Sequence, residues 1–599
     1  MGYMLVIQGS ARYCRANMYV KRYVLTRGDK RYSYLRLVAS YRTEEGKVRH
    51  RVLQTLGRED ELKASGALDQ LAASFARLDP PRLGIRREVG PLLVVRHVIE
   101  RCGIGEIIDD AAGRRRRSAL SVGEVIVALI ANRLAAPAPL YDVAGWGSGA
   151  ALQELFGIPA MLLNDDRLGR ALEEFHPVAE AVRGAVTLAA IDRFGVEAGR
   201  LHLDLTGLRF EGAYESSALV AKGWQAGGKV IRQVKALAAT NPQGVALYVR
   251  PHAGDQAELL CVGAALEALA KLCPPGLIVC ADSAFGHPKN LCEAQAAGVR
   301  FVVPLRRDCG FAQTFLSEVG HEALRPIRYV SRRQRRLPPG RRARYRGVLR
   351  PFPVTDPTTG RTHPFRVAYI HSSEEEKSVA EGRERALAKA EEALGRVSRG
   401  LGGRYYKTRK QVDDKVARIL IPSVMNLLKV RTGTRKGKPT LFFERDATAI
   451  AEAAKTDGIY ALATNLHGAA LSAGQLLRIY KDQSLVECAH RNAKGPLKVR
   501  PVFLHNDTRI EALVSVVGLA LVVFGLIEAE VRKALGDQEL LPGLLPEGRS
   551  GRPTGRNILA CFQGLGLTYT TDGIVLDRLT PTQRRVLQLL GVAVPWPEQ

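Results

Sequence analysis

The stretch RLHLDLTG, from Arg200 to Gly207, alternates apolar and polar side chains. Leucine occupies every second position, and His202, Asp204 and Thr206 fill the positions between. A period of two is typical of a β-strand with one apolar face. The pattern therefore predicts a strand that carries an acid, Asp204, on its other face.

A second acid follows a short apolar run further along the chain. Residues Gly276 to Ser283 read GLIVCADS, so that Asp282 stands directly after the run. A buried parallel strand shows this pattern where its carboxyl end meets solvent. An acid in this place is also a common helix N-cap, and the pattern alone fits both interpretations.

The segments around these two strands indicate how they are connected. Three strands, a helix, a strand, a helix and a strand are expected in that order. This is the order of a ribonuclease H-like fold, whose first and fourth strands lie side by side. We therefore expect Asp204 and Asp282 to come within reach of one metal ion. The expected elements after the Asp204 strand are an antiparallel pair (Val234–Thr240 and Val245–Val249), a helix (Gln256–Leu272), the Asp282 strand, a helix (Pro288–Ala297) and a strand (Arg300–Leu305).

A third acid lies in the stretch YKDQSLVE, from Tyr480 to Glu487. If this stretch and the residues after it form a helix, Tyr480, Glu487 and Lys494 lie nearly in line, because they are spaced by seven. Arg491, four residues after Glu487, joins the same face. An acid, two cations and a phenol on one face suit a metal ion and a phosphate. A solvated helix face with regularly spaced charges shows the same pattern.

The order of Asp204, Asp282 and Glu487 resembles that of the DDE transposases of bacterial insertion sequences. The spacing of Tyr480, Glu487 and Lys494 is similar to the Tyr-x2-Arg-x3-Glu-x6-Lys motif of one large branch. Gln483 stands where that motif has arginine, so this phosphate contact is weakened or is supplied elsewhere, with Arg491 as a candidate. The resemblance extends to a strand before the Glu487 helix, a segment after it and an N-terminal hairpin: Asp457–Asn465, Val499–Phe503, and Lys47–Leu53 with Leu56–Arg58.

The resemblance implies an α/β fold with a ribonuclease H-like catalytic core. A largely β insertion interrupts that core, and an N-terminal β region and a helical DNA-binding region precede it. The expected domains are an N-terminal β-rich region (1–88), a helical DNA-end-binding domain (89–196), the first part of the core (197–307), the insertion (308–454), the second part of the core (455–535) and a C-terminal region (536–599).

The resemblance also implies a reaction and its cofactors. Asp204, Asp282 and Glu487 are the expected catalytic residues and the ligands of two Mg²⁺ ions, with Mn²⁺ able to substitute. Ligand sets made only of oxygen favour these ions over zinc. The enzyme would bind the terminal inverted repeats of its element, cleave phosphodiester bonds and join the 3′-hydroxyl ends to target DNA, as a homodimer. His202 is expected to pack or to support a ligand rather than to bind the metal itself.

The charge of the chain favours a nucleic acid as partner. Its 599 residues include 88 Lys and Arg against 60 Asp and Glu, a net charge of +28. Such an excess suits a polyanion, although a generally arginine-rich proteome would supply part of it. The run Arg114–Arg117 suits either DNA contact or solvated surface. The expected DNA-binding residues are Arg341, Arg342 and Arg344 in an arginine-rich segment, Tyr405 and Tyr406 among cations, and Tyr480, Gln483, Arg491 and Lys494 near the cut.

A membrane role is not expected. The apolar run Ala512–Ile527 is shorter than the roughly 20 residues that span a bilayer, and Glu511 and Glu528 bracket it. A buried helix packed on a sheet fits it better. The nine cysteines are odd in number and include no Cys-x2-Cys pair, which favours reduced thiols in a cytosol and gives no zinc site. The resemblance implies a location in the bacterial cytoplasm, at the nucleoid.

Two other classes of protein remain open. A catalytically inactive or repurposed DNA-binding protein is favoured by Gln483 and opposed by the intact set of three acids. A ribonuclease H-like nuclease that cuts DNA without joining it would show the same acids. A strand-transfer assay separates these possibilities.

Overall fold

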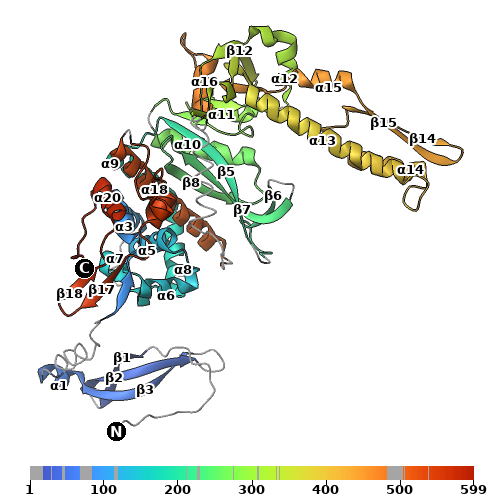
Figure 1. Ribbon diagram of the computed structural model, residues 1–599. Coiled ribbons are helices and arrows are strands. Elements are labelled where there is room, and N and C mark those ends of the chain that lie inside the picture. The colour runs from blue at the N-terminus through green and yellow to red at the C-terminus, as the bar shows by residue number, and fades with distance from the viewer. Residues whose placement is uncertain are drawn as a thin grey trace. The chain divides into compact units, whose positions relative to one another are not determined.

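The computed structural model describes two compact units, one formed by residues 1–85 with 568–573 and one by the remaining chain. Within them it describes residues 18–27, 30–42, 48–65, 67, 84–113, 119–210, 212, 214–225, 229–273, 275–306, 309–331, 334–335, 337–481, 504, 506–536 and 538–599. Figure 1 labels their elements.

The first unit is built around an antiparallel meander of three strands. β1 (Met18–Arg27), β2 (Lys30–Arg42) and β3 (Val48–Arg58) pair in the order β1-β2-β3, and the short helix α1 (Glu59–Ala64) follows. β3 includes Val48 to Leu53, part of the segment that resembles the family's N-terminal hairpin.

The second unit contains the sheet that the Asp204 strand was expected to join. β5 (Arg200–Arg209) pairs in parallel with β9 (Ile278–Cys280), which pairs in parallel with β10 (Arg300–Pro304). On its other side β5 is antiparallel to β7 (Lys229–Thr240). The far edge of β7 is shared by β6 (Ala221–Gln225) and β8 (Ala246–Ala253).

This arrangement is consistent with a ribonuclease H-like core. Reading across the sheet, β8-β7-β5-β9-β10 places the third, second, first, fourth and fifth strands of the expected series side by side. The two expected helices are α10 (Glu258–Leu272) and α11 (Pro288–Ala296). The side-by-side placement of the Asp204 and Asp282 strands is therefore confirmed.

The insertion differs from the largely β domain that the resemblance implies. Its first strands, β11 (Arg325–Ile327), β12 (Tyr345–Thr355) and β13 (Thr362–Ser372), extend the core sheet, because β13 pairs with β16 (Ile459–Thr464) and β16 pairs with β10. β16 covers the edge of β10, and the strands of the insertion in turn cover the edge of β16, which would otherwise expose unpaired backbone groups.

The rest of the insertion forms an arm that is mainly helical. The 27-residue helix α13 (Ser373–Arg399) begins where the Ser372 hydroxyl accepts from the backbone N–H of Glu375. At 1.5 Å per residue it is about 40 Å long. It leads to α14 (Arg409–Ile419), the hairpin β14 (Leu428–Arg435)–β15 (Lys438–Arg445) and α15 (Ala447–Ala454), as Figure 1 shows. Within this arm, the three helices contain more residues than the two strands of the hairpin.

Helices make up most of the region before β5, and the long helix α18 from later in the chain packs among them. A capping box between Ser121 and Glu124 begins α5. The elements are β4 (Arg86–Glu88), α3 (Leu92–Cys102), α4 (Ile104–Ala112), α5 (Val122–Ala135), α6 (Val143–Gly149), α7 (Leu152–Phe156), α8 (Asp165–Phe175) and α9 (Ala179–Phe194), with α18 (Asp507–Leu535), α19 (Gly555–Ala560), β17 (Gly566–Thr570), β18 (Gly573–Leu576) and α20 (Pro581–Leu590) near the end.

Helix α18 is the apolar segment for which a buried position was expected. It is the one unbroken helix in the described ranges that is long and apolar enough to cross a membrane, and 94% of its apolar window is buried. It packs on β8 and on α3, α5, α8, α9 and α20. Gly525 lets the backbone of α18 lie close to the residue before β8, because a Cβ at this position would be 2.8 Å from Val245 Cα. The expectation of a buried helix on a sheet is confirmed.

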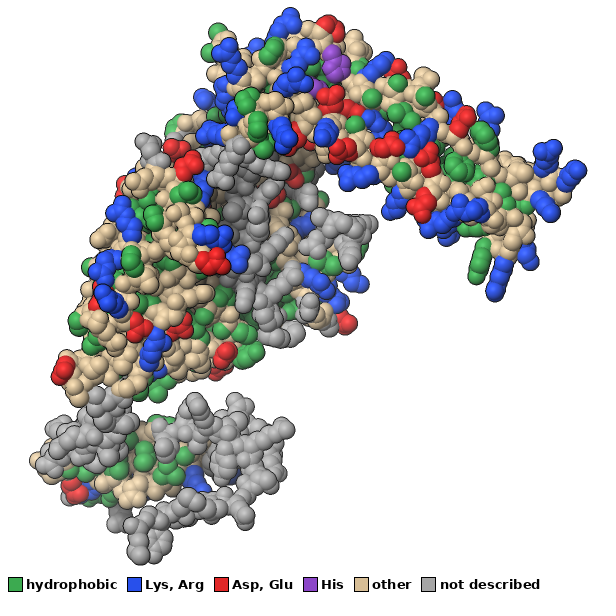
Figure 2. All heavy atoms as spheres, in the orientation of Figure 1, with side chains coloured by type: hydrophobic (Ala, Val, Ile, Leu, Met, Phe, Trp, Pro, Cys, Tyr) green, Lys and Arg blue, Asp and Glu red, His purple; other side chains and the backbone are tan. Residues whose placement is uncertain are grey.

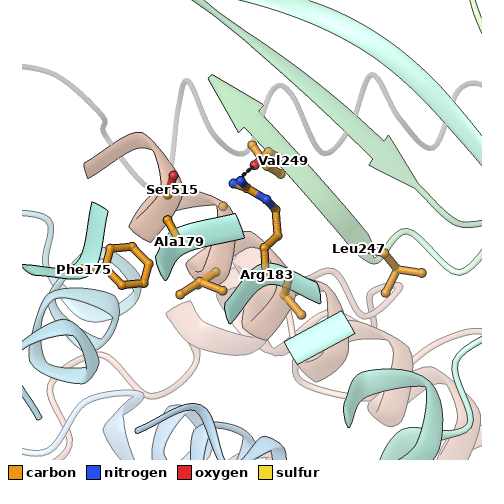
Figure 3. Close-up of a pocket in the computed structure, with 9 residues that line it drawn as sticks. Phe175, Ala179, Arg183, Leu247, Val249 and Ser515 are labelled. Carbon is orange, nitrogen blue, oxygen red and sulfur yellow. Dashed lines mark hydrogen bonds between the residues drawn. The ribbon is translucent and has the colours of Figure 1, made fainter. Parts of the chain in front are cut away.

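Figure 3 shows side chains that line the junction between α9, β8 and α18. Arg183 of α9 donates to the carbonyl oxygen of Val249 in β8 at 2.7 Å, beside Phe175 and Ser515. The remaining cavity is about 10 Å³, room for no more than a single water. The junction therefore fixes the helices to the sheet and leaves no space for a ligand.

Candidate active site

Asp204 lies on β5, and Asp282 follows the neighbouring parallel strand β9 by two residues. The parallel register pairs Arg200 with Ile278 and His202 with Cys280. Continued by two residues, it sets Asp204 opposite Asp282, on strands about 4.8 Å apart. Because alternate residues of a strand share a face, both acids belong to the face of His202 and Cys280.

The charges of the two acids affect each other. Although the Asp282 side chain is exposed, the protein packed around its carboxyl group raises its pKa, and the negative charge of Asp204 raises it further. Backbone N–H groups offset part of this effect, including that of Ala284, which donates to Asp282 at 3.0 Å. Two like charges held this way favour a cation between them.

The alternative interpretation of Asp282 as a helix N-cap does not hold. The next helix, α11, begins at Pro288, and its N-cap is His287, whose ring accepts from the backbone N–H of Lys289. Asp282 instead closes a turn, with its carbonyl oxygen accepting from Phe285. Its carboxyl group therefore remains beside Asp204 and does not serve a helix end.

His202 is fully buried, two residues before Asp204. Burial lowers its pKa to about 4, and the charge of Arg200 adds to that effect. Neither ring nitrogen has a hydrogen-bond partner among the described residues. His202 is therefore a neutral packing residue beneath the two acids at neutral pH.

Helix α16 (Ala473–Lys481) covers the same face of the sheet. Leu476 and Leu477 are buried in one apolar cluster with Cys280 of β9. Near the end of the helix, the carbonyl oxygen of Ile479 lies 3.8 Å from the Cys280 sulfur. The end of α16 thus lies beside the end of β9. β9 ends at Cys280, two residues before Asp282.

The remaining expected active-site residues lie outside the described residues. They are Gln483, Glu487, Arg491 and Lys494, and with them the segment Val499–Phe503 and the run Arg114–Arg117. Glu487 follows Lys481 by six residues, which can span up to roughly 20 Å. The path of α16 therefore brings the chain to the face of the sheet that carries Cys280, at the end where Asp282 lies. The placement of the third acid, Glu487, stays a prediction.

Tyr480 was expected to touch DNA, and its ring packs against protein. It is half-buried on the apolar cluster under α16, and its ring centroid lies 6.5 Å from that of Tyr460. The next residue, Lys481, was not expected to matter. Its ammonium lies 5.6 Å from the Tyr460 ring centroid and 5.9 Å from that of Tyr345. Burial lowers the pKa of Lys481, while Glu375 raises it.

The three arginines expected to bind DNA differ in their surroundings. Arg341 and Arg344 are exposed. Arg342 is half-buried and donates to the carbonyl oxygens of Leu337 at 2.8 Å and Arg335 at 3.2 Å. Arg342 therefore holds its own loop, and the other two remain available to a phosphate.

The neighbouring tyrosines expected to stack on bases also differ. Tyr405 is 73% exposed, with the Arg404 guanidinium 5.7 Å from its ring centroid. Tyr406 packs on an apolar cluster of the arm that contains Leu394 and Val412. Only Tyr405 of the pair is free to meet a ligand.

The oxygen atoms that the two acids offer can be compared with the ligands that the expected metal ion prefers. Asp204 and Asp282 supply carboxylate oxygens, the ligands that Mg²⁺ prefers. Within the described ranges, no three His, Cys, Asp or Glu side chains gather closely enough to hold a metal ion. The two acids fit Mg²⁺, and a third ligand must come from elsewhere.

A ribonuclease H-like sheet with paired carboxylates on its first and fourth strands defines a class of enzymes that act on phosphodiesters with divalent metals. Comparison with protein families agrees with this class. A transposase DDE domain matches residues 188–523, more than half of the chain. The N-terminal domain of IS1634 family transposases matches residues 21–81, and a domain of unknown function matches residues 86–181. No curated protein matches the chain. The chain belongs to the DDE transposases of insertion sequences, and the family implies DNA as its substrate.

Proposed function

We propose that this protein is the transposase of an insertion sequence in the branch with the Tyr-x2-Arg-x3-Glu-x6-Lys motif. It binds the terminal inverted repeats of its element as a homodimer, cleaves phosphodiester bonds and joins the 3′-hydroxyl ends to target DNA in the bacterial cytoplasm. Two observations support the proposal: the parallel pairing of the Asp204 strand with the strand that ends two residues before Asp282, and the effect of the Asp204 charge on the pKa of Asp282.

The proposed chemistry requires a third acid from the segment after α16. Asp204, Asp282 and Glu487 would together hold two Mg²⁺ ions, or Mn²⁺ in their place. Bound metal supplies activation of the attacking hydroxyl and stabilisation of the leaving oxygen. Asp204 and Asp282 must be ionised to serve. Burial raises the pKa of Asp282 and the charge of Asp204 raises it further, and a bound cation would relieve the repulsion between the two carboxylates.

The protein around the acids keeps them in place. The backbone pairing of β5 with β9 sets their separation, and the buried, neutral His202 keeps the layer beneath them apolar. Helix α16 directs the chain toward them through its contact with Cys280. In this proposal, Arg341, Arg344 and Tyr405 contact DNA away from the cut, and Gln483, Arg491 and Lys494 contact the phosphates beside it.

The test compares Asp204→Asn and Asp282→Asn with Asp192→Asn, an exposed acid on α9. Wild-type protein should cleave a labelled terminal-repeat duplex in Mg²⁺ and transfer the 3′ end to a second DNA. The two active-site variants should lose both activities and keep normal binding to the duplex, and Asp192→Asn should behave as wild type. An Asp204→Asn protein that cuts at the wild-type rate would refute the assignment. Cleavage without strand transfer would indicate a nuclease.

A further inference from the structure

Helix α16 lies on strands that the insertion adds to the sheet as well as on the core. Arg478 of this helix donates to the carbonyl oxygen of Arg328, the residue after β11, at 3.1 Å. A Cβ on Gly474 would lie 3.2 Å from the Ile327 side chain, so the start of the helix packs closely on the same strand. The helix that leads toward the two acids is therefore supported in part by the insertion.

The last residue of α16, Lys481, is half-buried. Figure 2 shows Lys and Arg side chains spread over much of the visible surface, where charged residues usually lie. Lys481 instead points its ammonium at two tyrosine rings, 5.6 Å from the ring centroid of Tyr460 and 5.9 Å from that of Tyr345. It forms no salt bridge with the residues that the structure describes.

The two rings belong to strands that neighbour each other through β13. Tyr345 begins β12 and is only 5% exposed, and its ring also contacts that of Tyr329 edge to face, at 5.4 Å between centroids. Tyr460 lies on β16, and its hydroxyl is buried without a hydrogen-bond partner in the described part of the chain. We call Lys481 together with Tyr345 and Tyr460 the lysine cage.

The stability of the fold does not explain a cation in this place. Burial lowers the pKa of Lys481, which shows that the surroundings disfavour its charge, and Glu375 in the first turn of α13 offsets part of this effect. Contact with aromatic faces offsets a further part, more so where water is excluded. An apolar side chain of the same length would fill the space without any such cost.

The lysine cage lies where the chain leaves α16 for the third expected acid. Two residues before Lys481, the carbonyl oxygen of Ile479 lies 3.8 Å from the sulfur of Cys280, the last residue of β9. Asp282 follows Cys280 by two residues, and Glu487 follows Lys481 by six. A shift of the last turn of α16 would therefore move the start of the next segment relative to Asp282.

We propose that Lys481 is a positioning residue for DNA cleavage, whose ammonium, held by the rings of Tyr345 and Tyr460, fixes the last turn of α16 beside the end of β9. This inference rests on the proposed function, because it takes the third acid from the segment after α16. Since Tyr345 belongs to the insertion, the insertion then takes part in shaping the active site itself.

The substitutions that test this separate the charge of Lys481 from its bulk. Lys481→Met keeps an apolar stem and removes the cation, whereas Lys481→Arg keeps a cation that also stacks on aromatic rings. Tyr345→Leu removes one ring of the lysine cage. Lys271→Met, at an exposed position on α10, is the matched control. Circular dichroism spectra like that of wild type establish that each full-length variant is folded.

The first measurement needs neither DNA nor metal. Hydrogen exchange at the amides of Leu477 to Lys481 reports opening of the last turn of α16. Exchange there should be about 30-fold faster in Lys481→Met, the worth of a desolvated cation on aromatic faces. It should change by less than about threefold in Lys481→Arg and stay at the wild-type rate in the control.

The second measurement is single-turnover cleavage of a labelled terminal-repeat duplex in Mg²⁺. Lys481→Met and Tyr345→Leu should each cleave about 30-fold more slowly and bind the duplex with wild-type affinity. The double variant should be about as slow as Lys481→Met alone, because the two side chains act through one contact. A merely structural role predicts weaker binding as well, additive losses and no rescue by arginine.

Two results would overturn the proposal. Equal exchange in Lys481→Met and wild type would show that the lysine cage does not hold the helix end. Faster exchange with cleavage at the wild-type rate would show that the helix end does not position the active site. Failure of the proposed function is distinct, because wild-type protein itself would then not cleave the duplex, whatever the exchange rates of the variants.

Discussion

The buried ion pair between Arg383 and Asp457 joins the arm to the core sheet. Both nitrogens at the end of the Arg383 side chain contact both carboxylate oxygens, one pair at 3.1 Å. The two side chains are only 13% and 7% exposed. Arg383 lies on α13, and Asp457 lies two residues before β16, so this pair fixes the base of the arm.

Replacing Arg383 with methionine keeps most of the apolar volume and leaves the Asp457 carboxylate buried without its partner. Removing one member of a buried pair costs about 3–5 kcal/mol. Domains are typically stable by about 5–15 kcal/mol, so this loss is a large fraction of the total. The double variant Arg383→Met with Asp457→Leu should recover most of the loss, because a well-packed apolar pair is often as stable as the ion pair it replaces.

Hydrogen exchange is the suitable assay, because a chain of this length need not unfold in a single step. The amides of β16 and of the first half of α13 report the free energy of local opening. Arg385→Met, at an exposed position two residues along α13, is the control and should change it by less than about 0.5 kcal/mol. If Arg383→Met differs from this control by less than 1 kcal/mol, or the double variant is no better than the single one, the pair does not anchor the arm.

Three further predictions concern the sheet and the site. Gly525→Ala should lower stability by about 1–3 kcal/mol, because its Cβ would press on Val245. Gly382→Ala, whose Cβ would meet nothing within 4 Å, should raise stability by about 0.5–1 kcal/mol. Thermal melting of the two variants compares these effects. Asp282→Asn should raise the melting temperature in EDTA. Folding raises the pKa of this acid, so its ionisation disfavours the folded state. The gain in melting temperature should therefore be present at pH 7 and vanish below pH 3.8, the ordinary pKa of the carboxyl group. A gain that persists in acid would contradict this. Asn465→Ala should cost about 1–3 kcal/mol in chemical denaturation, because it leaves backbone groups of the sheet unpaired, and an unchanged midpoint would show that water replaces the amide.

The strands and helices of the core could be predicted from local pattern. Alternation marked β5, and an apolar run marked β9. Their side-by-side placement followed from the order of elements rather than from any single residue. The pairing of β13 with β16 could not be foreseen, because the two strands lie nearly ninety residues apart and a local pattern indicates a strand without naming its partner.

The candidate site could be predicted in part. Asp204 and Asp282 do come together, and Glu487 stays a prediction. Tyr405 and Tyr406 have the same local sequence context, yet only the second is packed, which tertiary contacts alone decide. The hairpin that carries Phe442 had a recognisable pattern, alternating residues on either side of Lys436-Gly437.

The chain leaves the core sheet at the end of β13 and returns as β16, the antiparallel neighbour of both β13 and β10. Departure and re-entry therefore occur on adjacent strands, while Asp204 and Asp282 lie beyond β10, on β5 and directly after β9. A segment inserted between these points can lengthen, shorten or be exchanged for another without altering the spacing of the two carboxylates. Selection can thus change how far the protein reaches along its DNA while the catalytic geometry is inherited intact.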